Sequence, residues 1–459
     1  MSEKSAEGKR SSLIVDFTEG PVFRQLVTFA APLFLSNLLQ IVYNMVDMII
    51  VGQKMGSVGL SAVAVGGDVS NFMTLVAMGF SNAAQVIIAQ LIGMRRRKDL
   101  GRFIGTLFMF LFLIAIIIST VCMILRSPIL HVMNTPPESY TEALHYATVC
   151  MCGLIFIYGY NASSAILRGM GDSTRPFIFI SMAAGINVCL DLVFVMGLGL
   201  GAGGAALATV ISQAFSFSMC SIFLFRNRER YSIEVTRREF FHIDRVLLGK
   251  LVKLGLPMAI KGASVSFSRL FVNSWINSYG VVVSAFAGIA NKINTTTNLF
   301  SNAFNTSGSS MVGQNIGAEK FDRVKKIMFS VFRITLSIAT VLTLVMIFFH
   351  EQVYGLFTGD PVVIAVGVPY VAISVFIFYG SACRSGMNAL INGSGNYKIN
   401  FLTAILDAII LRIGLALLFG LALGMRQYGF WLGDALAGFT PFVIGLFFYF
   451  SGRWKRRMS

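Results

Sequence analysis

The sequence predicts an all-α polytopic membrane protein with twelve transmembrane helices in two six-helix lobes. Of the residues, 55% are hydrophobic and only 13% are charged, and the mean hydropathy is +0.73. This composition is typical of membrane proteins and excludes an ordinary soluble globule. The apolar runs are continuous instead of alternating, which favours helices over barrel strands. Motifs of the first half also recur in the second half.

Each predicted span is long enough to cross a bilayer, since about 20 helical residues at 1.5 Å each suffice. The spans are residues 25–51, 60–92, 102–125, 141–168, 176–198, 202–225, 250–278, 281–313, 327–349, 363–392, 399–423 and 428–452. Connections are short except for a charged stretch between the sixth and seventh spans. We therefore predict an N-lobe of residues 1–225, a cytoplasmic inter-lobe loop of 226–249 and a C-lobe of 250–459.

The two halves repeat each other. Pro32 in Ala-Ala-Pro-Leu matches Pro257 in Gly-Leu-Pro-Met, an offset of 257 − 32 = 225. Ala89-Gln-Leu-Ile-Gly-Met matches Gly313-Gln-Asn-Ile-Gly-Ala, an offset of 313 − 89 = 224, which also relates Leu167-Arg-Gly-Met-Gly-Asp to Ile391-Asn-Gly-Ser-Gly-Asn. Because each half has an even number of helices, both share one orientation, with a pseudo-two-fold axis along the membrane normal. Substrate is expected to bind between the halves.

Lys and Arg residues give the orientation. They gather in the loops on one side, whereas the opposite loops hold only Lys54, Arg126 and Arg426. Basic loops stay in the cytoplasm, so both termini are predicted to be cytoplasmic in a multi-pass protein of the plasma (inner) membrane. The formal charge of +16 is thus a topology signal, and no nucleic-acid partner is expected.

Asp47 is an acid inside the first span. An ionisable residue at such a depth costs about 2.5–3.5 kcal/mol on insertion scales. It is normally kept for an ion pathway, a proton relay or a pair with another charge. The alternative is a buried acid paired with a structural arginine.

Several polar residues are predicted to lie at a similar depth. On the predicted topology the outer half of the membrane holds Asp47, Asp68, Tyr146, Asp191, Thr209 and Lys292. Asn187 lies near the middle, one helical turn before Asp191 and on the same face. Two carboxylates in a low-dielectric pocket should bind a proton or share a cation. Oxygen ligands suit H⁺ or a hard cation such as Na⁺, so no transition metal or other cofactor is expected.

Two polar stripes occupy equivalent positions of the repeat. The second span carries Asp68, Asn71, Thr74, Met78, Asn82 and Gln85, and the eighth carries Lys292, Thr295, Asn298, Asn302, Asn305 and Ser309. This three-to-four spacing places each set on one helix face. Because unpaired polar groups in hydrocarbon are costly, the stripes should face protein or water. Helix packing through small residues is one interpretation, and a shared cleft is the interpretation that the duplication favours.

The second half of the chain has no acid near the position equivalent to Asp47. Val272 and Asn273 stand near the position equivalent to Asp47. Its intramembrane charges are Lys261, Arg269, Arg384, Asp407 and Arg412. We expect Arg384 and Asp407 to form a structural pair. Coupling chemistry is therefore expected in the N-terminal half.

Together these motifs resemble the multidrug and toxic compound extrusion (MATE) family along essentially the full chain. The matching residues are Pro32…Gln40…Tyr43-Asn44…Val46-Asp47…Gly52, Gln90…Gly93, Gln314…Gly317, Arg168-Gly-Met-Gly-Asp-Ser-Thr-Arg-Pro176, Asn187-Val-Cys-Leu-Asp191 and Gly203-Gly-Ala-Ala-Leu-Ala-Thr209. The resemblance implies cation-coupled antiport, in which H⁺ or Na⁺ enters as a drug leaves.

The DinF-like branch of that family implies a site in the N-lobe. Its cation-coupling residues correspond to Asp47, Tyr146, Asn187, Asp191 and Thr209, with Na⁺, if that is the ion, at Asp47, Asn187 and Asp191. Another branch uses acids in its seventh and tenth helices. Here Ser264, Val265 and Ser266 surround the first of those positions and helix 10 has no acid, so that site is not expected.

The expected function is a multidrug efflux antiporter in which the two lobes alternate access. Its substrate cavity should hold Gln40, Asn44, Asp68, Asn71, Lys292, Thr295, Asn298 and Asn302. Pro32 lacks an N–H and allows the first helix to bend. The 41 Phe and 22 Met suit small lipophilic substrates, cationic ones above all, although most of these side chains should face lipid or core. A monomer is expected.

Two other classes of function would place different demands on the sequence. A flippase for lipid-linked precursors or polysaccharides would need a cationic cavity, for which Lys261, Arg269 and Lys292 are candidates and against which the N-lobe acids weigh. An enzyme would need a nucleophile–base pair or metal cluster within the membrane. The four histidines are scattered, which argues against one: His131, His145, His242 and His350.

Overall fold

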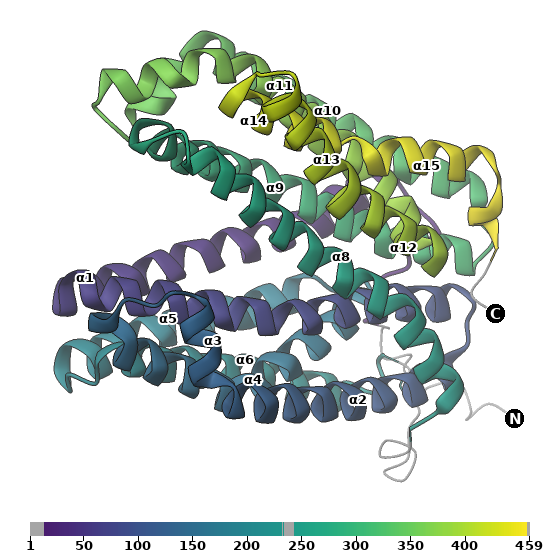
Figure 1. The fold of residues 1–459 in the computed structure, drawn as a ribbon. Coiled ribbons are helices and arrows are strands. Elements are labelled where there is room, and N and C mark those ends of the chain that lie inside the picture. The colour runs from purple at the N-terminus through teal and green to yellow at the C-terminus, as the bar shows by residue number, and fades with distance from the viewer. Residues whose placement is uncertain (1–12, 232, 234–242, 457–459) are drawn as a thin grey trace, which may run out of the picture. The chain divides into compact units, whose positions relative to one another are not determined.

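A computed structural model describes residues 13–231, 233 and 243–456 of the chain. In these ranges every regular element is a helix (Figure 1). Some basic residues of the N-terminus, His242 and part of the predicted inter-lobe loop lie outside the described residues. The prediction of an all-α protein is confirmed.

The described residues divide into two compact units. Unit 1 comprises the described parts of Met1–Phe17, Leu39–Ala77 and Ile87–Leu251. Unit 2 comprises Thr18–Leu38, Met78–Val86 and the described part of Val252–Ser459. Two stretches of the predicted N-lobe, residues 18–38 and 78–86, therefore pack with unit 2.

Unit 1 contains most of α1 (Val22–Gly93), which spans the first two predicted membrane segments. The helix is broken at Gly56, whose φ of 62° and ψ of −145° suit only glycine. The other elements are α2 (Arg97–Ile124), α3 (Arg126–Val132), α4 (Pro137–Gly169), α5 (Thr174–Asp191), the π-helix η1 (Leu192–Gly197) and α6 (Gly201–Arg226). Helix α4 packs extensively against α6.

Unit 2 contains most of α8 (Arg245–Asn277) and all the elements that follow it. These are α9 (Val281–Gly317), α10 (Phe321–Gly355), α11 (Pro361–Gly393), α12 (Tyr397–Ile405), the π-helix η2 (Leu406–Leu411), α13 (Arg412–Leu417), the π-helix η3 (Leu418–Ala422), α14 (Arg426–Ala437), α15 (Thr440–Phe450) and the 3₁₀-helix η4 (Arg453–Lys455). Helix α11 packs against both α9 and α10.

All twelve predicted spans fall on these helices. Among the described residues, nine helices are long and apolar enough to cross a membrane, and α1 alone contains two of the predicted spans. The predicted spans 250–278 and 281–313 are α8 and α9, which are more polar than the rest. Polar residues are expected on helices that line a path instead of facing lipid.

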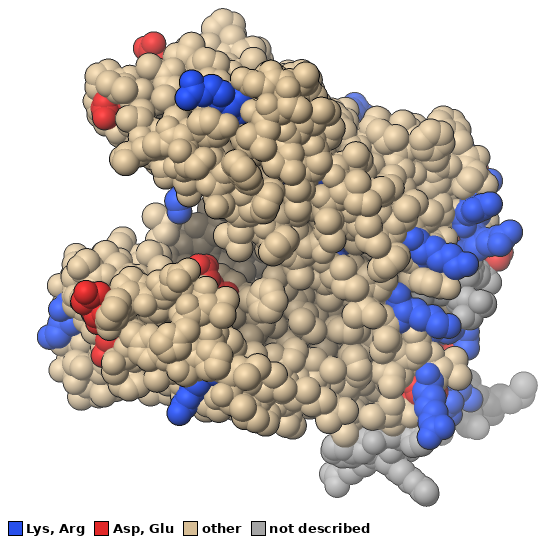
Figure 2. Space-filling model, in the orientation of Figure 1, with Lys and Arg blue, Asp and Glu red and all other residues tan. Residues whose placement is uncertain are grey.

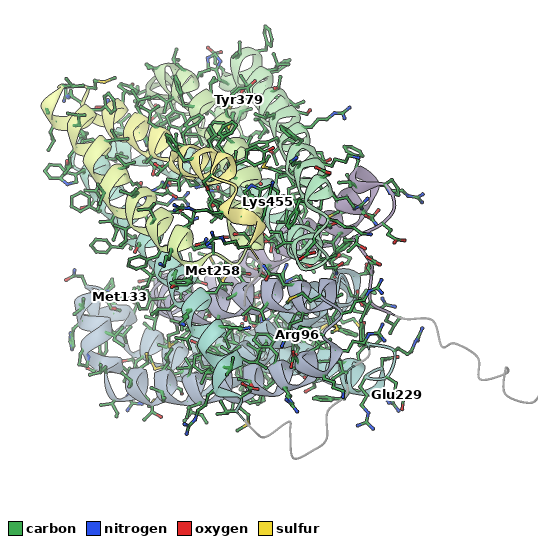
Figure 3. The ribbon with its side chains drawn as sticks, turned by 90° about the vertical axis from the view of Figure 1, so that its right-hand side faces the viewer. Arg96, Met133, Glu229, Met258, Tyr379 and Lys455 are labelled. Atoms are coloured by element: carbon green, nitrogen blue, oxygen red, sulfur yellow. The ribbon has the colours of Figure 1, made fainter. Side chains whose placement is uncertain are left out.

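The surface of each unit suits a bilayer. Figure 2 shows, on each unit, a broad face without charged side chains, with Lys and Arg gathered near one end. Carbon dominates the side chains that surround the helices in both units (Figure 3). Most charged side chains on the surface thus lie outside the region that the hydrocarbon core of a bilayer would contact.

The stretches of α1 in unit 2 make close contacts there. A side chain at Gly79 would meet the backbone of Ala259 at 2.5 Å, so only glycine permits this approach. Phe34 stacks on Phe300 with ring centroids 4.5 Å apart. The side-chain amide of Gln85 donates to the hydroxyl of Ser310 at 2.6 Å. These contacts explain why part of α1 belongs to unit 2.

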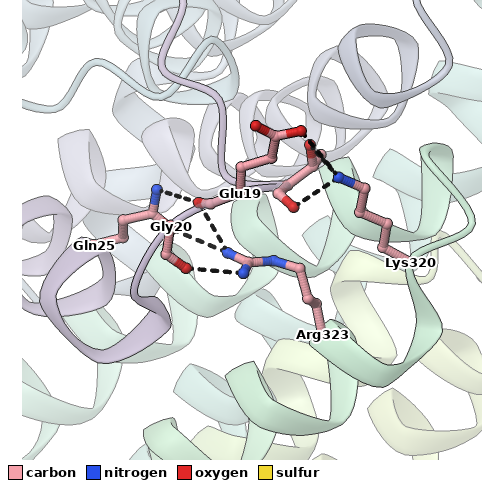
Figure 4. A network of polar contacts seen from close by, with 6 residues as sticks. Glu19, Gly20, Gln25, Lys320 and Arg323 are labelled. Carbon is pink, nitrogen blue, oxygen red and sulfur yellow. Dashed lines mark hydrogen bonds and ion pairs between the residues drawn. The ribbon is translucent and has the colours of Figure 1, made fainter.

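The segment before α1 is bound to the start of α10 (Figure 4). Lys320 Nζ donates to the carbonyl of Thr18 at 2.9 Å. Arg323 Nη1 donates to the carbonyl of Gly20 at 2.9 Å, and its Nη2 donates to Gln25 Oε1 at 3.2 Å. Lys320 and Arg323 belong to the basic loops that indicate the membrane orientation. They also bind the segment that leads into α1.

Candidate functional site

Two carboxyl groups face each other inside unit 1. Asp47 lies on α1 and is 5% exposed, and Asp191 is the last residue of α5 and is fully buried. The two side chains are within hydrogen-bonding reach of each other. When both are ionised, each is only an acceptor, so this contact needs a shared proton or a bound cation.

No protein donor satisfies three of the four carboxyl oxygens in the part of the chain that the structure describes. Asp47 Oδ1 and both carboxyl oxygens of Asp191 are buried without a hydrogen-bond partner. Both polar atoms of the Asn187 side chain, which is 2% exposed, are also without one. Buried polar groups are nearly always paired, and leaving one unpaired costs about 1–3 kcal/mol. A proton or a cation at this place would complete the bonding of these atoms.

Two tyrosines border the acids. Tyr146 on α4 is 8% exposed and interacts electrostatically with both Asp47 and Asp191. Tyr43 lies one turn before Asp47 on α1, interacts with it, and lies beside Gln213 of α6. The sequence identified Tyr146 as a site residue but not Tyr43 or Gln213. Tyr43 is four residues before Asp47, and Gln213 is four residues after Thr209. This helical spacing could have identified both as site residues.

Thr209 uses its hydroxyl within its own helix. The group donates to the carbonyl of Ala205 at 3.1 Å, one turn earlier on α6. The side chain is only partly buried. The structure thus groups Asp47, Asn187, Asp191 and Tyr146 directly, and it places Thr209 on a helix that also contributes Gln213.

The backbone changes conformation immediately after Asp191. Helix α5 ends at this residue and continues as the π-helix η1. The N–H of Leu198 reaches back five residues to the carbonyl of Val193 at 2.8 Å. Short π-helical turns inside α-helices are rare and often mark functional sites.

The donors available here are oxygens. The site offers two carboxyl groups, one amide and two phenols, which are hard ligands suited to H⁺ or Na⁺. Within the described ranges, no three His, Cys, Asp or Glu side chains come together as a metal site. Asp47, Asn187 and Asp191 are the residues that could hold Na⁺.

The residues expected in the substrate cavity lie on the two units separately. On unit 1, Asn44, Asp68 and Asn71 are exposed at the surface and Gln40 is partly buried. On unit 2, the exposed residues are Lys292, Thr295 and Asn302. Asn298 is partly buried, and its Oδ1 accepts a hydrogen bond from Arg384 Nη2 at 2.9 Å.

Pro32 lies inside α1, where the backbone remains helical. Its carbonyl accepts a bond from the hydroxyl of Ser36 at 2.8 Å. A proline has no N–H to give to the preceding turn, so it weakens the helix at this point without breaking it.

The charges of unit 2 pair differently from the prediction. Arg412 Nη2 contacts Asp407 Oδ1 at 3.0 Å, and Arg412 Nη1 bonds to Asp434 Oδ1. The expected pair of Arg384 with Asp407 is therefore wrong. Asp407 and Arg412 are five residues apart across the π-helix η2, and an i→i+5 turn brings such residues together. An α-helical turn would not have done so.

The MatE family model matches the chain twice, at residues 32–193 and 257–418. The two matches are offset by 257 − 32 = 225 residues, which confirms the predicted internal repeat. The first match contains Asp47, Asn187 and Asp191.

Relatives match along nearly their whole length. The chain is 26% identical to "Probable multidrug resistance protein YoeA" of Bacillus subtilis, covering 95% of each chain. It is 27% identical to "Probable multidrug resistance protein YpnP" of the same organism, covering 96% of this chain and 97% of that one. It is 24% identical to "Probable multidrug resistance protein NorM" of Thermotoga maritima, covering 95% and 93% respectively.

Solved structures share the fold. A multidrug resistance MATE transporter of the MOP superfamily, described in an outward-facing conformation, superposes with a TM-score of 0.88 at 22% identity, covering 97% of this chain and 99% of the other. A MOP superfamily transporter from Pyrococcus furiosus also superposes at 0.88 and 22% identity, covering 98% and 100%. The predicted architecture of two six-helix lobes is confirmed. The chain therefore belongs to the MatE family, the multidrug and toxic compound extrusion (MATE) transporters.

Proposed function

We propose that this protein is a cation-coupled antiporter that exports small molecules while H⁺ or Na⁺ moves inward. It acts in the plasma membrane with both termini in the cytoplasm. Family membership supports transport, and the basic residues of the loops support the orientation. One observation supports the coupling: two buried carboxyl groups face each other, and no donor lies between them among the described residues.

The coupling follows from electrostatics. Two ionised carboxylates in a low-dielectric interior repel each other, and either a proton or Na⁺ relieves the repulsion. Asp47 and Asp191 bind the ion, Asn187 supplies an amide oxygen for Na⁺, and Tyr146 and Thr209 line the site. Binding drives transport only if the two conformations differ in ion affinity, typically by about 1–3 kcal/mol of coupling free energy.

The substrate path is proposed between the lobes 1–225 and 250–459, which alternate access to the two sides. Its lining comprises Gln40, Asn44, Asp68, Asn71, Lys292, Thr295, Asn298 and Asn302. The relatives named as multidrug resistance proteins support small lipophilic substrates, cationic ones included. Bending of α1 near Pro32 would accompany the change of state. The protein is proposed to work as a monomer, in lipid, without a cofactor.

Transport in everted vesicles tests the proposal. An imposed ΔpH or Na⁺ gradient should drive uptake of a lipophilic dye by the wild type, and Asp47→Asn should abolish this response while inserting normally. Glu351→Gln is the matched control, because Glu351 is an exposed acid at the end of α10 and its replacement should leave uptake unchanged. Normal gradient-driven uptake by Asp47→Asn would contradict the scheme.

A flippase for lipid-linked precursors remains the second candidate. The observation that favours it is the set of basic residues in unit 2, Lys261, Arg269 and Arg384. A flippase would move a pyrophosphate-linked lipid across the vesicle membrane and would not concentrate the dye under either gradient. The same vesicle preparation therefore separates the two functions.

A further inference from the structure

Unit 2 contains a cluster of six charged side chains, two buried and four partly buried, that the proposed ion coupling does not use. They come from α8, α11, η2, α13 and α14, and they are Lys261, Arg269, Arg384, Asp407, Arg412 and Asp434. Each of the three cations on α8 and α11 interacts electrostatically with Asp407 and Arg412. We call this set the basic cluster. Four cations and two acids leave it with two positive charges in excess.

Arg412 forms ion pairs with both acids of the cluster, Asp407 and Asp434. Its Nη2 contacts Asp407 Oδ1 at 3.0 Å, and its Nη1 bonds to Asp434 Oδ1. The Arg412 side chain is 2% exposed and that of Asp407 is 1% exposed, so this part of the cluster is inaccessible. Lys261, Arg269 and Arg384 interact electrostatically with this ion-pair network.

Two of the other three cations have neutral partners. Lys261 Nζ donates to Asn388 Oδ1 at 3.0 Å, and Arg384 Nη2 donates to Asn298 Oδ1 at 2.9 Å. Lys261, Arg269 and Arg384 make no ion pair within 4.0 Å among residues 13–231, 233 and 243–456. Amide oxygens orient these cations but do not neutralise them.

These three side chains are also partly exposed, unlike Arg412. An uncompensated charge within a membrane segment is expensive and is normally retained for a ligand or a pathway. Guanidinium groups bind carboxylate and phosphate through parallel hydrogen bonds, and an ammonium group adds a point charge. An oxyanion is therefore the ligand that would complete the cluster.

We propose that Lys261, Arg269 and Arg384 bind an anionic group, a carboxylate or phosphate, of the transported molecule. The assignment to a transported molecule rests on the proposed export function. It changes the expected substrate class: amphiphiles that carry an acidic group, including zwitterions, should be preferred over purely cationic compounds.

Two dyes with the same ring system test this preference. Rhodamine B carries a free carboxylate, and its ethyl ester does not. In purified full-length protein in detergent, fluorescence anisotropy should give an affinity for rhodamine B at least about tenfold higher than for the ester. Equal affinities would overturn the proposal.

Variants locate the preference. Arg384→Gln should weaken rhodamine B binding about tenfold and leave the ester within about twofold, and Lys261→Met should do the same. Arg384→Lys keeps the charge and should retain most of the preference. Arg333→Gln removes an exposed charge from α10 of the same unit and should change neither affinity. Equal losses for both dyes in Arg384→Gln and Lys261→Met would contradict a site for the carboxylate.

Lipid composition separates a substrate from a lipid headgroup. In nanodiscs of phosphatidylcholine the preference for rhodamine B should persist, and phosphatidylglycerol should not remove it. Loss of the preference only in phosphatidylglycerol would assign the cluster to lipid and overturn the substrate assignment.

Binding needs no ion gradient, so it is independent of the vesicle experiment. Failure of gradient-driven uptake would leave the dye preference standing, and failure of the dye preference would leave the coupling scheme standing.

Discussion

The acid pair of unit 1 and the ion-pair network of unit 2 lie in the same region of the internal repeat, but only the network joins charges of opposite sign. At the offset of 225, Asn187 corresponds to Arg412 (412 − 187 = 225) and Thr209 corresponds to Asp434 (434 − 209 = 225). Unit 2 thus places a bonded cation and acid where unit 1 has two neutral polar side chains. Arg412 pairs with both Asp407 and Asp434, whereas in the described residues Asp47 Oδ1 and both carboxyl oxygens of Asp191 have no hydrogen-bond partner.

Backbone landmarks support this register. Gly199 and Gly424 both have left-handed backbone, with φ of 67° and 68°, and they are 225 residues apart. Earlier, Gly171 and Gly395 share positive φ at an offset of 224. One residue has therefore been inserted between them in the second half. The π-helix η2 lies in that interval and has no counterpart in α5, and its wide turn accommodates an extra residue.

The acids themselves have apolar counterparts. Asp47 corresponds to Val272 and Asp191 to Ala416, which are 3% and 0% exposed. Both lie in the hydrophobic core cluster of unit 2, together with Phe286. The comparison teaches that the fold does not require acids at these positions. Their presence in unit 1 is therefore evidence of a function there.

The largest predicted effect is on the network of unit 2. Replacing Arg412 with Leu leaves the buried Asp407 and Asp434 without their shared cation, and the free energy of unfolding should fall by about 3–5 kcal/mol. Thermal unfolding of purified protein in detergent measures this. A variant that also carries Asp407→Asn and Asp434→Asn should recover much of the loss, because no unpaired charge remains. If Arg412→Leu alone unfolds at the same temperature as the wild type, the network does not stabilise unit 2.

A second variant moves the acid to the corresponding position in unit 2. Val272→Asp buries a carboxyl group in an apolar core and should cost about 2 kcal/mol or more. The reverse change in unit 1, Asp47→Val, removes an unsatisfied acid and should not lower the melting temperature. If both variants lose the same stability, the two positions do not differ in the way that the structure indicates.

A third variant separates stability from coupling in unit 1. Asp191→Asn removes one of two facing negative charges, so stability should stay within about 1 kcal/mol of the wild type or increase. Gradient-driven uptake should nevertheless be lost. Melting and vesicle transport are measured on the same preparation. A large loss of stability would instead support the alternative of an acid that pairs with a structural cation.

The smallest effect concerns Thr209. Its hydroxyl donates to the carbonyl of Ala205 within α6, so Thr209→Ala should change stability by about 0.5 kcal/mol. If Thr209 lines the ion site, the cation concentration that gives half-maximal uptake should rise several-fold. If this cation concentration is unchanged, Thr209 is not part of the ion site. The site then comprises the two acids, Asn187 and the tyrosines.

The helical membrane fold, the internal repeat and the positions of the two acids could be predicted from the residues alone. Hydrophobic length sets the spans because a bilayer has a fixed thickness. Asp47 and Asp191 are identifiable because an acid is rare and costly in an apolar helix. Asn187 and Tyr146 followed from helical spacing, depth and family resemblance.

The partners of these groups depend on how the helices pack, and they could not be predicted from the residues alone. Tyr43 and Gln213 join the site through packing of α1 against α6, which no local pattern specifies. The pairing of Asp407 with Arg412 depends on a π-helical turn, and sequence reasoning that assumes 3.6 residues per turn misplaces it. The physical reason is that hydrophobic periodicity reports which face of a helix is buried, whereas hydrogen bonding depends on the exact turn and on distant neighbours.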